Sequence, residues 1–251
     1  MIPGLDAFRK KPAAAGAAAW QVHQNKTDQA VRDASEVLRK AGFVPSKIYG
    51  NLAGIANRLR LAPLGDNTRF LQMGLLAQEI ERRGVEGAIA ELGVYRGGFT
   101  KFISRAFRNR RYYLFDTFEG FDEKQIARDT KVFNASGHDF TDTSVEHVLG
   151  MIDPDSGCEV IVRKGFFPST AEGLEDTFAF VSLDADLYDP TLDGLKYFYP
   201  RMARGGYIMV HDLMADRYQG CRKAVYEFCN DQNIFFVPLP DAICSALIVK
   251  S

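Results

Sequence analysis

The chain lacks the sequence features that mark several classes of protein. Its 251 residues contain four cysteines, and no two of them form a C-x-x-C pair, so a zinc site is not expected. Well-separated cysteines of this kind are typical of reduced, buried thiols, and we expect a cytoplasmic protein. No apolar run approaches the roughly 18 residues that a membrane span needs. These absences argue against a zinc protein and against a membrane-spanning protein.

The chain also lacks an excess of charge of either sign. Lysine and arginine number 31 against 32 aspartates and glutamates, which gives a net charge of −1. Nucleic-acid binding is not expected, because it usually shows a basic excess or patch. The hydrophobic content of 46% is ordinary for a globular protein and can supply a sizeable core.

The first part of the chain has the weakest pattern. A basic tripeptide at 9–11 precedes the alanine-rich stretch 13–19, but that stretch lacks leucine, isoleucine and valine, so we expect an arm and not a signal peptide. Helices are predicted at 28–41 and 68–83. Residues 1–84 are therefore predicted to form an N-terminal arm and helices that act as a cap or an oligomer contact. The apolar face of the helix at 68–83 could support a homodimer.

From residue 85 to residue 251 the chain alternates between strand and helix patterns. Strands are predicted at 87–92, 111–116, 158–163, 178–184, 205–210, 233–237 and 244–249. Helices are predicted at 98–108, 143–151, 168–174, 190–201 and 218–231. This alternation predicts an α/β fold with a doubly wound, mostly parallel seven-stranded sheet. The link 238–243 is too short for a crossover helix, so the last two strands should form an antiparallel hairpin, as in the Rossmann-like class I methyltransferase fold.

The segment Glu91–Gly98 (E-L-G-V-Y-R-G-G) places an acid and three glycines between a strand and a helix. Glycines in such a turn let the backbone approach a ligand closely. A carboxylate beside the turn suits a cationic group such as the ammonium or sulfonium of S-adenosylmethionine (SAM). The alternative is a plain glycine turn, which many α/β proteins contain.

Acids also follow three other predicted strands. Asp116 ends the second strand 23 residues after Gly93, where it could hold a ribose or cap the following loop. Asp184 and Asp186 follow the fourth strand, and the pair His211-Asp212 follows the fifth. Carboxylates that converge on one edge repel one another unless a cation or protons intervene, and oxygen ligands suit Mg²⁺. The alternative is that these acids only terminate their strands.

Four segments together resemble the macrocin O-methyltransferase family, which methylates sugar hydroxyls on natural products. They are E-L-G-V-Y-R-G-G from Glu91, F-D-T-F-E-G-F from Phe115, G-F-F-P-S-T from Gly165 and S-L-D-A-D-L-Y from Ser182. The resemblance covers about residues 85–250 and implies that 85–251 is a SAM-dependent methyltransferase domain. It implies SAM as the methyl donor, Mg²⁺ as the metal and a small-molecule acceptor with a hydroxyl, such as a sugar or glycoside.

The resemblance also assigns roles to individual residues. The implied SAM-binding residues are Glu91, Gly93, Tyr95, Gly97, Asp116, Ser144 and Asp184. The implied metal ligands are Asp184, Asp212 and His211, and Asp186 is the implied catalytic base. The family often has two adjacent acids where this chain has His211-Asp212, so either the histidine replaces one ligand or the metal site is altered.

Two other functions stay open from the sequence alone. The departure at His211 and the unfamiliar arm are compatible with a SAM-binding module that no longer catalyses. A nicotinamide-dependent oxidoreductase could use a similar sheet, but the G-x-G-x-x-G motif is missing and the terminal hairpin counts against it.

Overall fold

The computed structural model describes residues 67–136, 139–239, 241 and 243–251. All of them belong to one compact unit, Gly54–Ser251. The arm and the helix that the sequence predicts at 28–41 lie outside the described residues, so both stay predictions.

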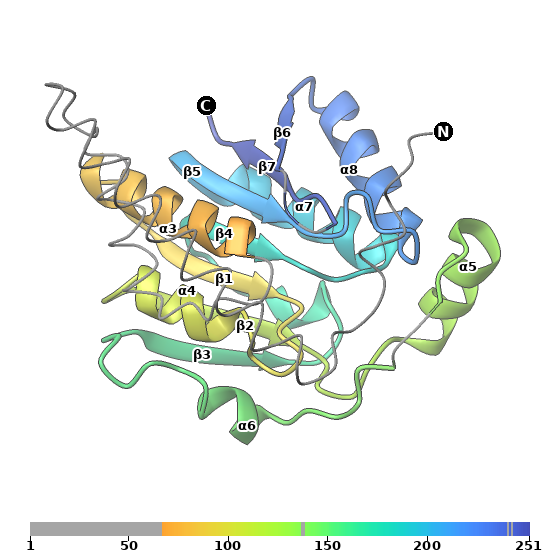
Figure 1. The fold of residues 1–251 in the computed structure, drawn as a ribbon, viewed down its shortest axis with the longest axis horizontal. Helices are drawn as coiled ribbons and strands as arrows, with labels where there is room; N and C mark the ends of the chain where they lie inside the picture. Colours follow the sequence, from red (N-terminus) through yellow and green to blue (C-terminus); the bar gives the residue numbers. More distant parts are fainter. Residues whose placement is uncertain (1–66, 137–138, 240, 242) are drawn as a thin grey trace, which may run out of the picture. The chain divides into compact units, whose positions relative to one another are not determined.

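The described residues form one seven-stranded sheet with the order β3-β2-β1-β4-β5-β7-β6 (Figure 1). The strands are β1 Ala88–Leu92, β2 Arg111–Asp116, β3 Glu159–Lys164, β4 Phe178–Leu183, β5 Met202–Val210, β6 Phe236–Pro238 and β7 Ala246–Val249. The first five strands pair in parallel, and β7 is antiparallel to both β5 and β6. The predicted sheet with its C-terminal antiparallel hairpin is therefore confirmed.

The central strands are buried on both faces of the sheet, which explains why they are mostly apolar. All five residues of β1 are buried. Successive side chains of a strand point to opposite faces, so Ala88 and Ala90 join one hydrophobic cluster and Ile89 joins the other. The two clusters form the two halves of a doubly wound core.

Helices cover both faces of this sheet (Figure 1). They are α3 Asn67–Arg82, α4 Thr100–Ala106, α5 Glu123–Phe133, α6 Val145–Leu149, α7 Tyr188–Arg201 and α8 Gln219–Asp231. Helices α7 and α8 contribute to the cluster that contains Ala90, and α3 and α4 contribute to the one that contains Ile89. Within the described ranges, no helix combines the length and the apolar character that a membrane crossing requires.

Helix α3 confirms the helix predicted at 68–83 and belongs to the core. Its Met73, Leu76 and Ile80 are at most 5% exposed and lie in the same cluster as Ile89. These are side chains of the apolar face from which we expected an oligomer contact, and in the structure they are buried in the core beside the sheet. Dimerisation itself stays a prediction.

Two helical elements differ from the sequence prediction. Helix α5 was not predicted, and its N-cap Asp122 accepts hydrogen bonds from the backbone amides of Lys124 and Gln125. The helix predicted at 168–174 is reduced to a 3₁₀ turn at Ser169–Ala171. Gly173, at φ +70°, has left-handed backbone, which ends any continuation of that turn.

Candidate active site

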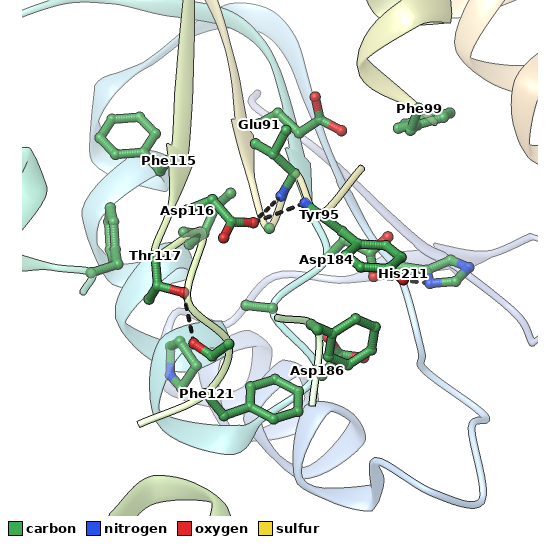
Figure 2. A pocket seen from close by; sticks show the side chains of 18 of the residues that line it. Glu91, Tyr95, Phe99, Phe115, Asp116, Thr117, Phe121, Asp184, Asp186 and His211 are labelled. Atoms are coloured by element: carbon green, nitrogen blue, oxygen red, sulfur yellow. Dashed lines mark hydrogen bonds and ion pairs between the residues drawn. The ribbon is translucent and has the colours of Figure 1, made fainter. Parts of the chain in front are cut away.

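A cavity of about 480 Å³ lies at the carboxyl ends of β1, β2, β4 and β5 (Figure 2). This position is the switch point of a doubly wound sheet, where such folds bind ligands, and the volume suits a small molecule. The predicted site residues that line it are Glu91, Gly93, Tyr95, Asp116, Asp184, Asp186, His211 and Asp212. The sequence thus identified most of the polar wall of this cavity.

Two of the predicted SAM-binding residues are not among those that line the cavity. The hydroxyl of Ser144 caps α6 by accepting a hydrogen bond from the amide of His147 at 3.1 Å. Gly97 has φ +71°, and a β-carbon there would meet the side chain of Met151 at 3.2 Å. Gly97 therefore lies in the turn between β1 and α4, and Ser144 lies at the start of α6.

The glycine turn is pressed against the end of β4. Gly93 has φ +86°, and a β-carbon at this position would lie 1.9 Å from the backbone oxygen of Asp184. The amide of Asp184 donates to the carbonyl of Leu92 at 2.8 Å, and the amide of Gly93 donates to the carbonyl of Phe115 at 2.9 Å. Only glycine fits here, so the turn fixes the end of β1 between β2 and β4.

Asp116 organises the loops around the cavity. One of its carboxylate oxygens accepts from the amides of Val94 and Tyr95 at 2.7 and 2.9 Å, and the other accepts from the amide of Phe118 at 2.7 Å (Figure 2). This is the loop-capping role that the sequence left open. Ribose binding by the same carboxylate stays a prediction.

Glu91 is a buried acid on the wall of the cavity. It is 2% exposed and accepts hydrogen bonds from Thr100 Oγ1 at 2.6 Å and from the Tyr112 hydroxyl at 2.5 Å. Burial raises the pKa of Glu91 to about 7, although both hydroxyls favour the charged form. Because the pKa of this carboxyl lies near neutral pH, a cationic ligand beside it would stabilise the charged form.

Asp184, His211 and Asp212 form a compact cluster. His211 Nδ1 lies 3.0 Å from Asp184 Oδ1 and 3.4 Å from Asp212 Oδ1. One ligand atom from each residue lies within 4.8 Å of the others, which is close enough for a shared metal ion. The three predicted metal ligands are therefore brought together.

Two residues of this cluster, Asp184 and His211, carry opposite charges. Burial opposes charge on Asp184, but His211 and Arg69 outweigh it and hold the pKa of Asp184 well below its usual value. Burial likewise lowers the pKa of His211, but Asp184 outweighs that effect and raises it to about 9. At neutral pH the two residues thus form an imidazolium–carboxylate pair.

Asp186, the predicted base, lies beside this cluster. Burial and the neighbouring carboxylates of Asp212 and Asp184 raise the pKa of Asp186 well above its usual value. Its backbone is left-handed, with φ +59°, as is that of Asp212, with φ +61°. Such conformations are uncommon outside glycine and are enriched at functional sites.

Of the charged residues that line the cavity, sequence analysis missed Asp122 and, on α3, Arg69. Its Nη2 donates to Asp184 Oδ2 at 3.0 Å, and its guanidinium carbon lies 4.1 Å from the centre of the Phe99 ring. The residue is 8% exposed and lines the cavity. No motif marks it, because it belongs to a helix whose packing over the sheet only the fold reveals.

The rest of the wall is largely aromatic. The lining phenylalanines are Phe70, Phe99, Phe115, Phe121, Phe140, Phe166 and Phe167. The Phe121 and Phe140 rings pack edge to face at 5.1 Å, and Phe140 packs against Tyr95 at 5.0 Å. Tyr188 is not among the lining residues; its ring stacks on Phe133 and its hydroxyl donates a hydrogen bond to Glu227.

The charges of the lining residues favour a cationic ligand. The lining acids are Glu91, Asp116, Asp122, Asp184, Asp186 and Asp212, and the lining bases are Arg69 and His211. Six acids against two bases leave a negative surplus, which would attract a cation into the cavity.

The chain is similar in sequence to known O-methyltransferases. The family model described as macrocin-O-methyltransferase (TylF) matches residues 61–240. A tetracenomycin-C 4'-O-methyltransferase from Streptomyces olivaceus, which acts on a dimethoxy-rhamnosyl compound by its name, is 29% identical over 180 residues, or 65% of this chain and 64% of that protein. The mycinamicin III 3''-O-methyltransferase from Micromonospora griseorubida is 30% identical over 59% of this chain and 62% of that protein.

Solved structures share the fold. The O-methyltransferase NovP has a TM-score of 0.58 at 24% identity over 73% of this chain and 80% of its own, and the calicheamicin methyltransferase CalS11 has a TM-score of 0.59 at 19% identity over 81% and 93%. The chain spans 62 to 64% of the length of the two curated relatives above. Because the family model covers residues 61–240, the chain belongs to the macrocin-O-methyltransferase (TylF) family.

Proposed function

We propose that the chain is a SAM-dependent O-methyltransferase that acts on a hydroxyl of a sugar or a glycosylated natural product. The observation that carries the proposal is the convergence of Glu91, Asp116 and Asp184 on one cavity around the glycine turn. One curated relative is named for an acceptor that carries a rhamnosyl sugar, and the other is named as a mycinamicin III O-methyltransferase, which supports the acceptor class. We further propose that the protein works in the cytoplasm.

The donor would lie along the glycine turn. Glu91, Gly93 and Tyr95 would contact its methionine and sugar parts, and Asp116 would hold the ribose with the lone pairs that its amide contacts leave available. We assign no donor contact to Gly97 or Ser144, because neither is among the residues that line the cavity.

The donor set of Asp184, Asp212 and His211 fits a divalent cation, and we propose that this cation is Mg²⁺. Two carboxylates supply oxygen ligands, and the three ligand atoms lie within 4.8 Å of one another. A bound Mg²⁺ would supply Lewis-acid polarisation of the acceptor oxygen. His211 occupies the position where the family often has a second acid, and it would serve as the third ligand once its imidazolium has given up a proton.

The residues of the chain would then orient the acceptor and remove its proton. As the new O–CH₃ bond forms and the S–CH₃ bond breaks, the hydroxyl proton would pass to the Asp186 carboxylate and S-adenosylhomocysteine would leave. General-base assistance of this kind contributes roughly 10²- to 10⁴-fold. Alignment of the oxygen, methyl and sulfur by the cavity wall would supply much of the rest.

Titration calorimetry with SAM, followed by a methyl-transfer assay on a panel of glycosides, tests this function. Binding and transfer together would support it. SAM binding without transfer to any acceptor would favour the catalytically inactive module, and NADH binding without SAM binding would favour the oxidoreductase.

Removal of divalent cations tests the metal separately. We expect excess EDTA to lower the initial rate of methyl transfer at least about tenfold, because a Lewis acid contributes several kcal/mol to such a step. Added Mg²⁺ should restore the rate. An unchanged rate in EDTA would defeat the metal assignment and leave the methyltransferase assignment standing.

A further inference from the structure

Arg69 is a buried cation with unused hydrogen-bonding capacity. Its side chain is 9% exposed, and its ion pair with Asp184 joins Nη2 to Oδ2 at 3.0 Å. The buried Nε atom has no hydrogen-bond partner among the residues that the structure describes. A guanidinium offers five N–H donors and no acceptor, so Arg69 can accommodate a further anion.

The Arg69 guanidinium packs against an aromatic ring on one side and faces the cavity on another. Its carbon lies 4.1 Å from the centre of the Phe99 ring, which is a favourable cation–π distance. Its positive charge acts on both Glu91 and Asp184, two acids that line the same cavity. One cation and two anions are therefore held together at the end of the glycine turn.

This arrangement matches the methionine end of SAM, which carries a carboxylate and an ammonium on one carbon. Resting on the proposed function, we infer that Arg69 binds the α-carboxylate of the donor, while Glu91 and Asp184 neutralise its ammonium. The ion pair between Arg69 and Asp184 is then exchanged for two ion pairs with the zwitterion. Neither Arg69 nor Asp184 is left unpaired in either state, which avoids the large penalty of an isolated buried ion.

A second arginine, on the neighbouring helix α4, provides a matched control. Arg105 on α4 is 9% exposed, and its Nε donates to Asp153 Oδ2 at 2.8 Å. It lies beside the Phe102 ring at 5.9 Å and is not among the residues that line the cavity. Arg105 therefore shares the burial, the ion pair and the aromatic neighbour of Arg69 without its access to the ligand.

Calorimetry with SAM and with decarboxylated SAM, which lacks only the α-carboxylate, isolates the contact. We expect the wild-type protein to bind SAM at least about tenfold more tightly, as one charge-assisted contact would give. Arg69→Met should lose at least about tenfold in affinity for SAM and little for the decarboxylated donor, which removes the preference. Arg105→Met should keep the preference, and Arg69→Lys should retain part of it.

The possible outcomes separate this inference from the proposed function. Equal binding of the two donors by the wild-type protein would overturn the inference without requiring any variant to fold. An equal loss for both donors in Arg69→Met would also overturn it, since a purely structural arginine would give that result. If the wild-type protein binds neither donor, the proposed function itself fails.

Discussion

Replacement of Asp184 by asparagine is expected to lower methyl transfer at least about 10³-fold, while SAM still binds, about tenfold more weakly, because Glu91 remains to face its ammonium. Asparagine keeps the size of the side chain but removes the charge that faces Arg69 and His211 at 3.0 Å each. It also removes a proposed metal ligand, and the loss of an electrostatic group that acts on the transition state costs about 10²- to 10³-fold or more. Single-turnover kinetics and calorimetry on the same preparation would measure both quantities.

Asp153→Asn is the control for this prediction. Asp153 also pairs with a buried arginine, Arg105, but does not line the cavity. We expect the two variants to lose comparable thermal stability and only Asp184→Asn to lose turnover. Normal turnover in Asp184→Asn would remove this residue from both the metal site and the mechanism.

The convergence of the acidic residues could be predicted because it follows from chain topology. The carboxyl ends of parallel strands meet at one edge of a sheet, so residues after β4 and β5 had to lie near the end of β1. Gly93 could be identified in the same way, since a strand that turns tightly beside its neighbour needs left-handed backbone. Local sequence and strand order were sufficient in these cases.

Arg69 could not be predicted, because its role depends on tertiary packing. The pattern of α3 showed an apolar face, but which polar residue of that helix reaches the sheet edge depends on how the helix sits over β1. Helix α5 was missed for a different reason. Its capping residues Asp122 and Asn134 were visible in the sequence, but its apolar positions are few, and Val132 is 60% exposed.

Glu91→Gln is expected to stabilise the protein most above pH 7 and by less than about 1 kcal/mol at pH 5. The pKa of Glu91 in the folded protein is raised to about 7 from 4.5 by burial, with Asp184 adding to the shift and Thr100, Tyr112 and Arg69 opposing it. The unfolded chain therefore loses this proton first, and stability falls as pH rises between these two values. A shift of this size corresponds to about 3 kcal/mol, so the gain in the free energy of unfolding should approach that figure. Urea unfolding at pH 5, 6, 7 and 8 would measure it.

The same substitution should weaken SAM binding about 10- to 100-fold at pH 8, because the amide cannot neutralise the donor's ammonium. In the wild-type protein, a cation beside Glu91 favours the carboxylate, so binding near pH 7 should release a proton and tighten as pH rises from 6 to 8. Calorimetry in buffers of different ionisation enthalpy would count that proton, and Glu91→Gln should abolish its release.

Glu79→Gln, which removes a carboxylate bonded to Arg82 away from the cavity, should change neither the stability nor the binding of SAM. A variant that gains stability and still binds SAM normally would show that the buried charge of Glu91 serves no ligand, and the cation at this end of the cavity would have to be held by Asp184 alone.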